Sequence, residues 1–117
     1  KSTRVELRSP DPSCNPYLAV AVCLAAGLDG IERSLTPPPS IIHNIYEMDE
    51  ETRRSYGIES LPGSLKEALD ELENDKLITD VLGEHVTRQY VLGKQKEWEE
   101  YQTRVSSWEL EKYLVTY

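Results

Sequence analysis

The feature that most limits how this chain can fold is an uninterrupted apolar run between residues 17 and 26. Asn15 is a good N-cap and Pro16 suits the first position of a helix, so the run is predicted to begin a helix at this point. The helix is predicted to stop at Gly27, since glycine commonly follows a helix end. Because the run leaves no polar face, the helix should be buried on all sides. The rest of a 117-residue chain can hardly surround it, so we expect it to pack against additional structure.

Composition and charge exclude several classes of partner. The chain carries a net charge of −8, and its basic residues are scattered rather than clustered. Phosphate contacts require a clustered basic surface, so we expect neither nucleic acid nor a membrane as a partner. The apolar run is also shorter than the about 20 residues that a membrane span needs. Cys14 and Cys23 lack further ligands at zinc spacing and would have to bridge most of a helix, so we predict two reduced thiols in a cytoplasmic protein.

Residues 3–9 are predicted to form the one strand of the chain. Side chains alternate in an extended segment, so Arg4, Glu6 and Arg8 share one face while apolar side chains occupy the other. Pro10 ends the strand because it has no N–H group to donate to a neighbouring strand.

Two interpretations of this charged face stand open from the residues alone. Alternating arginine and glutamate is typical of a solvated face that makes cross-strand ion pairs. Alternatively, the Glu6 carboxylate binds a divalent metal beside a guanidinium group that binds an anionic substrate, because carboxylate oxygens suit magnesium or manganese and arginine suits phosphate or carboxylate. Composition does not decide between them.

The remainder of the chain is predicted to be helical after a loop region. Ser64 and Glu67 form a capping-box pattern before an amphipathic helix that reaches residue 74. Asp75 should cap a short helix, and residues 84–104 should form the longest one. A second capping-box pattern, at Ser106, precedes a last helix. We therefore predict a mainly α fold in a single domain, 1–117, with one N-terminal strand and about five helices, divided into strand and turn 1–12, buried helix 15–30, loop region 31–63 and C-terminal helices 64–117.

The motifs resemble a known family. The chain is similar to the carboxy-terminal part of bacterial-type (type I) glutamine synthetases in three blocks: Arg4-x-Glu6-x-Arg8-x-Pro10-Asp11, Asn15-Pro16-Tyr17-Leu18-Ala19 and Ala26-Gly27-Leu28-Asp29-Gly30-Ile31. The resemblance continues through Asn44-Ile45-Tyr46 to the aromatic residues near the end. The sequence also opens inside a predicted strand and without methionine, so we expect a piece of a longer polypeptide.

The resemblance implies a role for each charged residue of the strand. Glu6 matches a glutamate that binds an active-site Mg²⁺ or Mn²⁺ ion. Arg8 matches a catalytic arginine that holds L-glutamate and faces the transferred phosphoryl group, and Arg4 matches an arginine near the nucleotide phosphates. The family makes γ-glutamyl phosphate from ATP and glutamate and then glutamine with ammonia, with release of ADP and phosphate. The strand would belong to the catalytic β-barrel of the family, and the isolated chain is expected to be inactive.

Regulation and assembly are also implied by the resemblance. Some relatives are adenylylated on the tyrosine that matches Tyr46, but residues 47–49 differ from that subgroup, so modification is not expected here. In such enzymes the last helix reaches the opposite ring of a homododecamer, and the carboxy-terminal surface of some relatives contacts nitrogen-control regulators. The residues suited to the ring contact are Trp108, Leu110, Tyr113, Leu114 and Tyr117.

Two other functions remain open. One is a non-catalytic helical module for protein binding or oligomerisation, which would have no need for Glu6 and Arg8 on one face. The other is a γ-glutamyl ligase that uses an amine other than ammonia, and the present residues do not separate it from glutamine synthesis.

Overall fold

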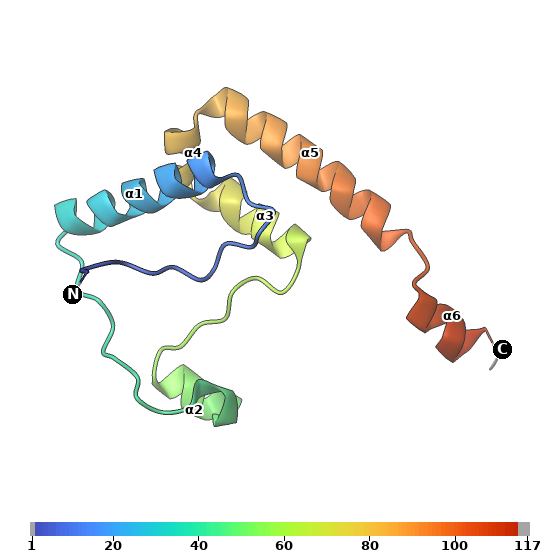
Figure 1. Ribbon diagram of the computed structural model, residues 1–117, viewed down its shortest axis with the longest axis horizontal. Coiled ribbons are helices and arrows are strands. Elements are labelled where there is room, and N and C mark those ends of the chain that lie inside the picture. The colour runs from blue at the N-terminus through green and yellow to red at the C-terminus, as the bar shows by residue number, and fades with distance from the viewer. Residues whose placement is uncertain (1, 115–117) are drawn as a thin grey trace.

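The computed structural model describes residues 2–114, and all regular structure in this range is helical. Figure 1 shows the order of the elements along the chain, with the N-terminal segment and the last helix at opposite ends. The elements are α1 (Pro16–Glu32), the 3₁₀ helix η1 (Ile45–Glu47), α2 (Glu50–Ser55), α3 (Leu65–Asn74), α4 (Lys76–Leu82), α5 (Glu84–Gln102) and α6 (Ser107–Tyr113).

Four helices form the body of the molecule. Helix α1 packs on α4, while α3 and α4 pack on α5 and on each other. The two buried hydrophobic residues among those described are Leu69 of α3 and Val91 of α5, which are 2% and 6% exposed. Helices α2 and α6 lie away from this body, α6 beyond the end of α5 (Figure 1). The core is therefore confined to the contact between α3, α4 and α5.

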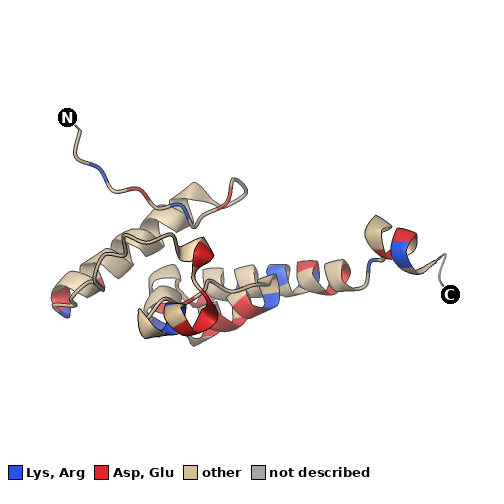
Figure 2. Ribbon diagram, turned by 90° about the horizontal axis from the view of Figure 1, so that it is seen from below, with Lys and Arg blue, Asp and Glu red and all other residues tan. Residues whose placement is uncertain are grey.

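The chain exposes far more surface than a compact domain of its mass. Its accessible surface is 10763 Å² and its radius of gyration 18.7 Å. A folded monomer of this size would have about 6,500 Å² of surface and a radius of gyration of about 13 Å. Much of the excess is apolar, because no residue of α1 is buried and Figure 2 shows this helix without charge until its last turn. The predicted burial of α1 by additional structure stays a prediction.

The predicted strand at residues 3–9 is wrong. No strand occurs among residues 2–114, and the segment before α1 runs as an irregular trace (Figure 1). The physical reason is the lack of a second strand, because a ladder satisfies N–H and C=O groups only across two strands. The alternation of charged and apolar residues indicates which side chains share a face of this segment. Among residues 2–114 there is, however, no strand whose backbone could hydrogen-bond with it.

The predicted end of the first helix is also wrong. Helix α1 continues through Gly27 and Gly30 to Glu32, and a Cβ atom added at either glycine would meet no atom within 4 Å. A glycine inside a helix costs about 1 kcal/mol relative to alanine but does not force an end, since it can adopt helical dihedrals. The helix ends instead before Ser34, whose φ of 51° leaves the right-handed helical region.

The region 31–63, predicted as loop, contains the short elements η1 and α2. Helix α2 begins where the Asp49 carboxylate accepts a hydrogen bond of 2.7 Å from the Thr52 amide. Such six-residue helices have no room for an apolar repeat, so their caps are the main sequence signal.

The C-terminal helices are confirmed, together with most of their caps. The Ser64 hydroxyl accepts from the Glu67 amide at 3.2 Å, although the Glu67 carboxylate accepts from Gly63 rather than from Ser64. In α6 both hydrogen bonds of the capping box are present between Ser106 and Glu109.

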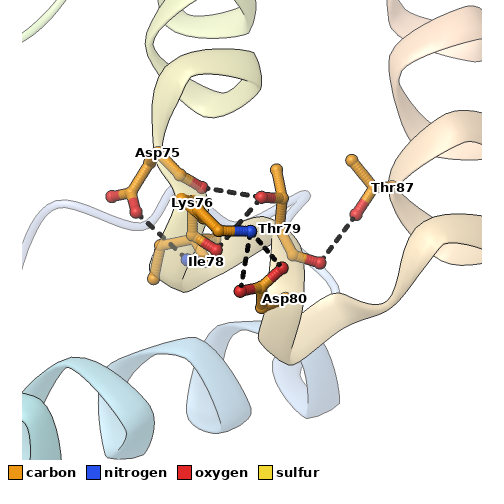
Figure 3. Close-up of polar contacts among 6 residues, drawn as sticks. All are labelled: Asp75, Lys76, Ile78, Thr79, Asp80 and Thr87. Atoms are coloured by element: carbon orange, nitrogen blue, oxygen red, sulfur yellow. Dashed lines mark hydrogen bonds and ion pairs between the residues drawn. The ribbon is translucent and has the colours of Figure 1, made fainter.

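The junction between α4 and α5 is shown in Figure 3. The Asp75 carboxylate accepts from the Ile78 amide at 3.1 Å and so caps α4 as predicted. Across the junction, the Thr87 hydroxyl donates to the Thr79 carbonyl at 3.4 Å, and Gly83 joins the two helices with a positive φ of 77°.

Candidate functional site

The structure brings the three predicted site residues of the N-terminal segment together. The Arg8 Nε donates to the Glu6 Oε1 at 2.6 Å, and the Arg4 Nη2 lies 3.9 Å from the Glu6 Oε2. Each oxygen of the Glu6 carboxylate therefore faces a different guanidinium group. The predicted sharing of one face holds even though the ladder of a strand is absent.

All three side chains of this cluster are exposed to solvent. The Arg8 side chain is 88% exposed and the Glu6 side chain 49% exposed. Exposed ion pairs of this kind contribute about 0–1 kcal/mol each, because solvent screens both charges. The cluster can therefore exchange its internal ion pairs for a bound ion or substrate at little cost in stability.

The Glu6 carboxylate fits a divalent metal as one ligand and no more. Hard cations such as magnesium take about six oxygen ligands. No group of three or more His, Cys, Asp or Glu residues that could hold a metal lies together in the described range 2–114. These residues do not complete a coordination shell by themselves.

The charged cluster connects to the helical body through a turn at Asp11. The Ser13 amide and hydroxyl donate to the Asp11 Oδ1 at 2.7 and 2.6 Å, and the Cys14 amide donates to the Asp11 carbonyl at 3.2 Å. The Ser13 hydroxyl and then its amide hold the pKa of the Asp11 carboxyl below its ordinary value. Asp11 belongs to the first motif block of the sequence, but no role was predicted for it. The signal that could have found it is the Asp-x-Ser spacing, which is typical of a turn closed by a side chain.

An apolar cavity of about 240 Å³ lies behind this turn. Its walls come from the start of α1, from α3 and α4, and from Tyr90 of α5, and it reaches the turn at Cys14 and Asn15. Cys14 and Cys23 are both free thiols and both exposed. A larger and more polar groove of about 650 Å³ runs between α4 and α5 and includes Asp80, Glu84 and Arg88.

The tyrosine at the modification position of some relatives is fully accessible. Tyr46 is 100% exposed in η1, and its amide donates to the Asn44 side chain at 3.2 Å. Full exposure is compatible with an unmodified tyrosine and with a modified one. It therefore does not test the expectation that Tyr46 is unmodified.

Helix α6 presents an exposed aromatic surface. The Trp108 and Tyr113 rings lie 5.8 Å apart and nearly perpendicular, and the Lys112 Nζ lies 4.6 Å from the centre of the Trp108 ring. Leu110 and Leu114 are also exposed. Tyr117, the last residue predicted for a ring contact, lies outside the described residues.

Comparison with known proteins identifies the family. Residues 1–113 match the model of the family described as "Glutamine synthetase, catalytic domain". The chain therefore belongs to the glutamine synthetase family.

Individual relatives agree over nearly the whole chain. It is 56% identical to a glutamine synthetase of Thermus thermophilus over 115 residues and 55% identical to one of Thermotoga maritima over 114 residues. A glutamine synthetase of Methanocaldococcus jannaschii is 50% identical over 115 residues. These alignments cover 98%, 97% and 98% of this chain but only 26%, 26% and 25% of the relatives. The chain thus spans about a quarter of the length of the curated relatives that it matches.

None of the helices described between residues 2 and 114 is long and apolar enough to cross a membrane.

Proposed function

We propose that this chain forms part of the catalytic domain of a glutamine synthetase that ligates ammonia to L-glutamate through γ-glutamyl phosphate, with ATP as the phosphoryl donor. The observation that carries the proposal is the family match over residues 1–113, within which Glu6 and Arg8 lie in direct contact. Glutamine, ADP and phosphate are the products, and the enzyme is cytoplasmic.

Each residue of the charged cluster has a chemical role in this proposal. Arg8 binds the glutamate substrate, because a guanidinium group can donate two parallel hydrogen bonds to a carboxylate and can also neutralise the phosphoryl group as it moves. Arg4 binds the nucleotide phosphates for the same reason. Glu6 supplies one ligand to Mg²⁺ or Mn²⁺, which when bound would neutralise charge on the phosphates.

The ion pair with Glu6 also keeps Arg8 ready for its substrate. In the free chain each carboxylate oxygen of Glu6 faces an arginine, so the three side chains hold one another near their working positions. A metal ion held by Glu6 would share the negative charge of this carboxylate and would leave Arg8 available to an anionic substrate. Because the pair is exposed, breaking it costs about 1 kcal/mol or less.

We propose further that the 117 residues alone are inactive, because one carboxylate does not make a metal site. The complete enzyme would be a homododecamer in which α6 contributes to the contact between rings, and its exposed aromatic surface suits that use. Contacts of this surface with nitrogen-control regulators belong to the same proposal, and Tyr46 is proposed to be unmodified.

A helical interaction module is the second candidate. The observation that favours it is the exposed apolar surface of α1 and α6, since apolar patches of this extent usually mark an interface. It gives no role to Glu6 and Arg8, so the catalytic proposal explains more of the chain.

The test is a chimera in which residues 1–117 replace the matching quarter of the Thermus thermophilus glutamine synthetase. We expect ATP-dependent glutamine formation by the chimera and none by the 117 residues alone. Glu6→Ala should weaken metal binding, and Arg8→Ala should raise the KM for glutamate by about tenfold or more, since hydrogen bonds to a charged group are worth about 1.5–3 kcal/mol.

The matched control is Arg54→Ala. Arg54 makes an equally short and exposed ion pair, 2.6 Å from Glu50, but it lies in α2 rather than in the cluster. This variant should keep the kinetics of the parent chimera. Wild-type kinetics in Glu6→Ala or Arg8→Ala would remove the role proposed for that residue, and glutamine formation by the 117 residues alone would refute their inactivity.

A further inference from the structure

The connection between the charged cluster and the helices depends on very few interactions. Every hydrogen bond and ion pair that the structure records for residues 2–10 is made within that segment. Asp11 is the first residue whose polar contacts reach toward α1, through the three bonds from Ser13 and Cys14. In the described part of the chain, the position of Arg8 relative to the helices therefore depends on the geometry at Asp11.

The residues around Asp11 make this connection stiff. Pro10 and Pro12 each fix their own φ near −65°, and a residue before proline is restricted to extended conformations. Asp11 lies between the two prolines, so few dihedrals remain free between Arg8 and the turn. The hydrogen bonds to its carboxylate and carbonyl restrain the dihedrals that follow it.

The turn is also held against the helices on its other side. Asn15, two residues after Ser13, is the N-cap of α1, and its side chain accepts from the Tyr17 and Leu18 amides at 3.0 and 3.3 Å. Cys14 and Asn15 line the same cavity as Tyr90 of α5. The pKa of Lys94, one turn after Tyr90, is raised first by its hydrogen bond to Glu97, and the Asp11 charge is the smallest of the causes.

We propose that Asp11 is a positioning residue of the glutamine synthetase site. Through its turn it holds the Glu6–Arg8 segment at a set orientation to α1 and α5, and it does not itself touch substrate. This inference depends on the proposed function, because the groups that it positions are the proposed ligands for metal and glutamate. Misplacing Arg8 weakens its contact with bound glutamate and its approach to the moving phosphoryl group, so the KM for glutamate should rise and kcat should fall.

Three variants in the chimera described above test the proposal. Asp11→Ala removes the acceptor for both Ser13 bonds, whereas Asp11→Asn keeps a side-chain oxygen that can accept them. Asp49→Ala is the matched control, because Asp49 is also an exposed carboxylate with a lowered pKa and accepts a hydrogen bond of 2.7 Å from the Thr52 amide. It caps α2 and lies far from the cluster in sequence.

We expect Asp11→Ala to raise the KM for glutamate by about fivefold, which corresponds to the net contribution of one hydrogen bond, and to lower kcat as well. Asp11→Asn should restore the KM to within about twofold of the parent, and Asp49→Ala should leave it unchanged. An unchanged KM in Asp11→Ala, no rescue by asparagine, or an equal change in Asp49→Ala would each overturn the inference.

A measurement on the 117-residue chain separates this inference from the proposed function. Backbone ¹⁵N relaxation reports the order of the Glu6 and Arg8 amides without any need for activity. Asp11→Ala should lower the order parameters of both amides, and Asp11→Asn should not. If the parent chimera is inactive but this difference is seen, the proposed function fails while the positioning by Asp11 stands. If the order parameters are equal in all variants, the positioning is refuted even in an active enzyme.

Discussion

Two glycines at and after the α4–α5 junction should respond to the same substitution in opposite directions. Gly83 has φ 77° and ψ 155°, whereas Gly93 lies inside α5. A Cβ atom added at either position meets no atom within 4 Å, so packing does not distinguish them. The difference between the two substitutions therefore reports backbone conformation alone.

The magnitudes follow from these conformations. Residues other than glycine in the region that Gly83 occupies cost about 1–3 kcal/mol, so Gly83→Ala should lower the free energy of unfolding by that amount. Alanine inside a helix is favoured over glycine by about 0.5–1 kcal/mol, so Gly93→Ala should raise it. The two variants should thus differ by about 1.5–4 kcal/mol.

The assay is urea unfolding of the 117-residue chain followed by far-ultraviolet circular dichroism, with the slopes of the variants compared to confirm that the transition is the same. If Gly83→Ala leaves no folded baseline, the double variant Gly83→Ala/Gly93→Ala should recover one. Changes of the same sign in the two single variants would refute the argument, because they would show that something other than the backbone conformation of Gly83 sets the response.

The two remaining predictions concern the core and α6. Leu69→Ala should lower the free energy of unfolding by about 2–5 kcal/mol, whereas Leu92→Ala, at a side chain that is 51% exposed, should lower it by about 1 kcal/mol or less. Urea unfolding measures both values. Equal costs would mean that the contact between α3 and α5 is not the core. The amide and then the hydroxyl of Ser106 hold the pKa of the Glu109 carboxyl below its ordinary value. The ionised carboxylate therefore stabilises α6 fully at pH values above the unfolded-state pKa. This stabilisation is lost as the pH falls through the lower folded-state pKa. The Ser106 amide shift should follow this acid transition in NMR spectra, and Glu109→Gln should remove it; an identical acid transition in the glutamine variant would contradict the assignment.

The elements that could be predicted from sequence are those whose signals are local. Ser64, Asp75 and Ser106 begin their helices where their capping patterns placed them. Each pattern is satisfied by hydrogen bonds within about four residues, so it needs no information about the rest of the fold. The prediction of a helical majority was right for this reason.

The errors concern elements whose outcome depends on distant residues. The alternation in residues 3–9 indicated a strand, but a strand exists only when another strand pairs with it. Gly27 offered a local stop signal, yet α1 continued to Glu32 because glycine can also adopt helical dihedrals. Helix α2 was missed because six residues carry no periodic pattern.

The candidate site was predictable in part. The shared face of Arg4, Glu6 and Arg8 follows from two-residue spacing, and the structure shows the contacts between them. Their roles toward metal, glutamate and nucleotide are not contained in that geometry, since an exposed Arg–Glu–Arg cluster has the same shape whether or not it binds a ligand. The turn at Asp11 has a local signal in its Asp-x-Ser spacing, but this pattern does not show that the turn joins the charged cluster to the helices.

The amount of surface that the chain exposes favours one of the two candidate functions over the other. The chain exposes about 4,000 Å² more than a compact domain of its mass, and stable interfaces between separate proteins usually bury about 1,200–2,000 Å² in total over both partners. A recognition module would expose one apolar patch on an otherwise closed domain. Here α1 packs on α4 but has no buried residue, and residues 2–10 lack backbone partners as well. An apolar helix without a polar face and an extended segment without a ladder both require surrounding structure on the scale of a domain core. This requirement favours the catalytic domain over the interaction module, because only the former places both elements inside a larger fold and gives Glu6 and Arg8 the neighbours that a binding site needs.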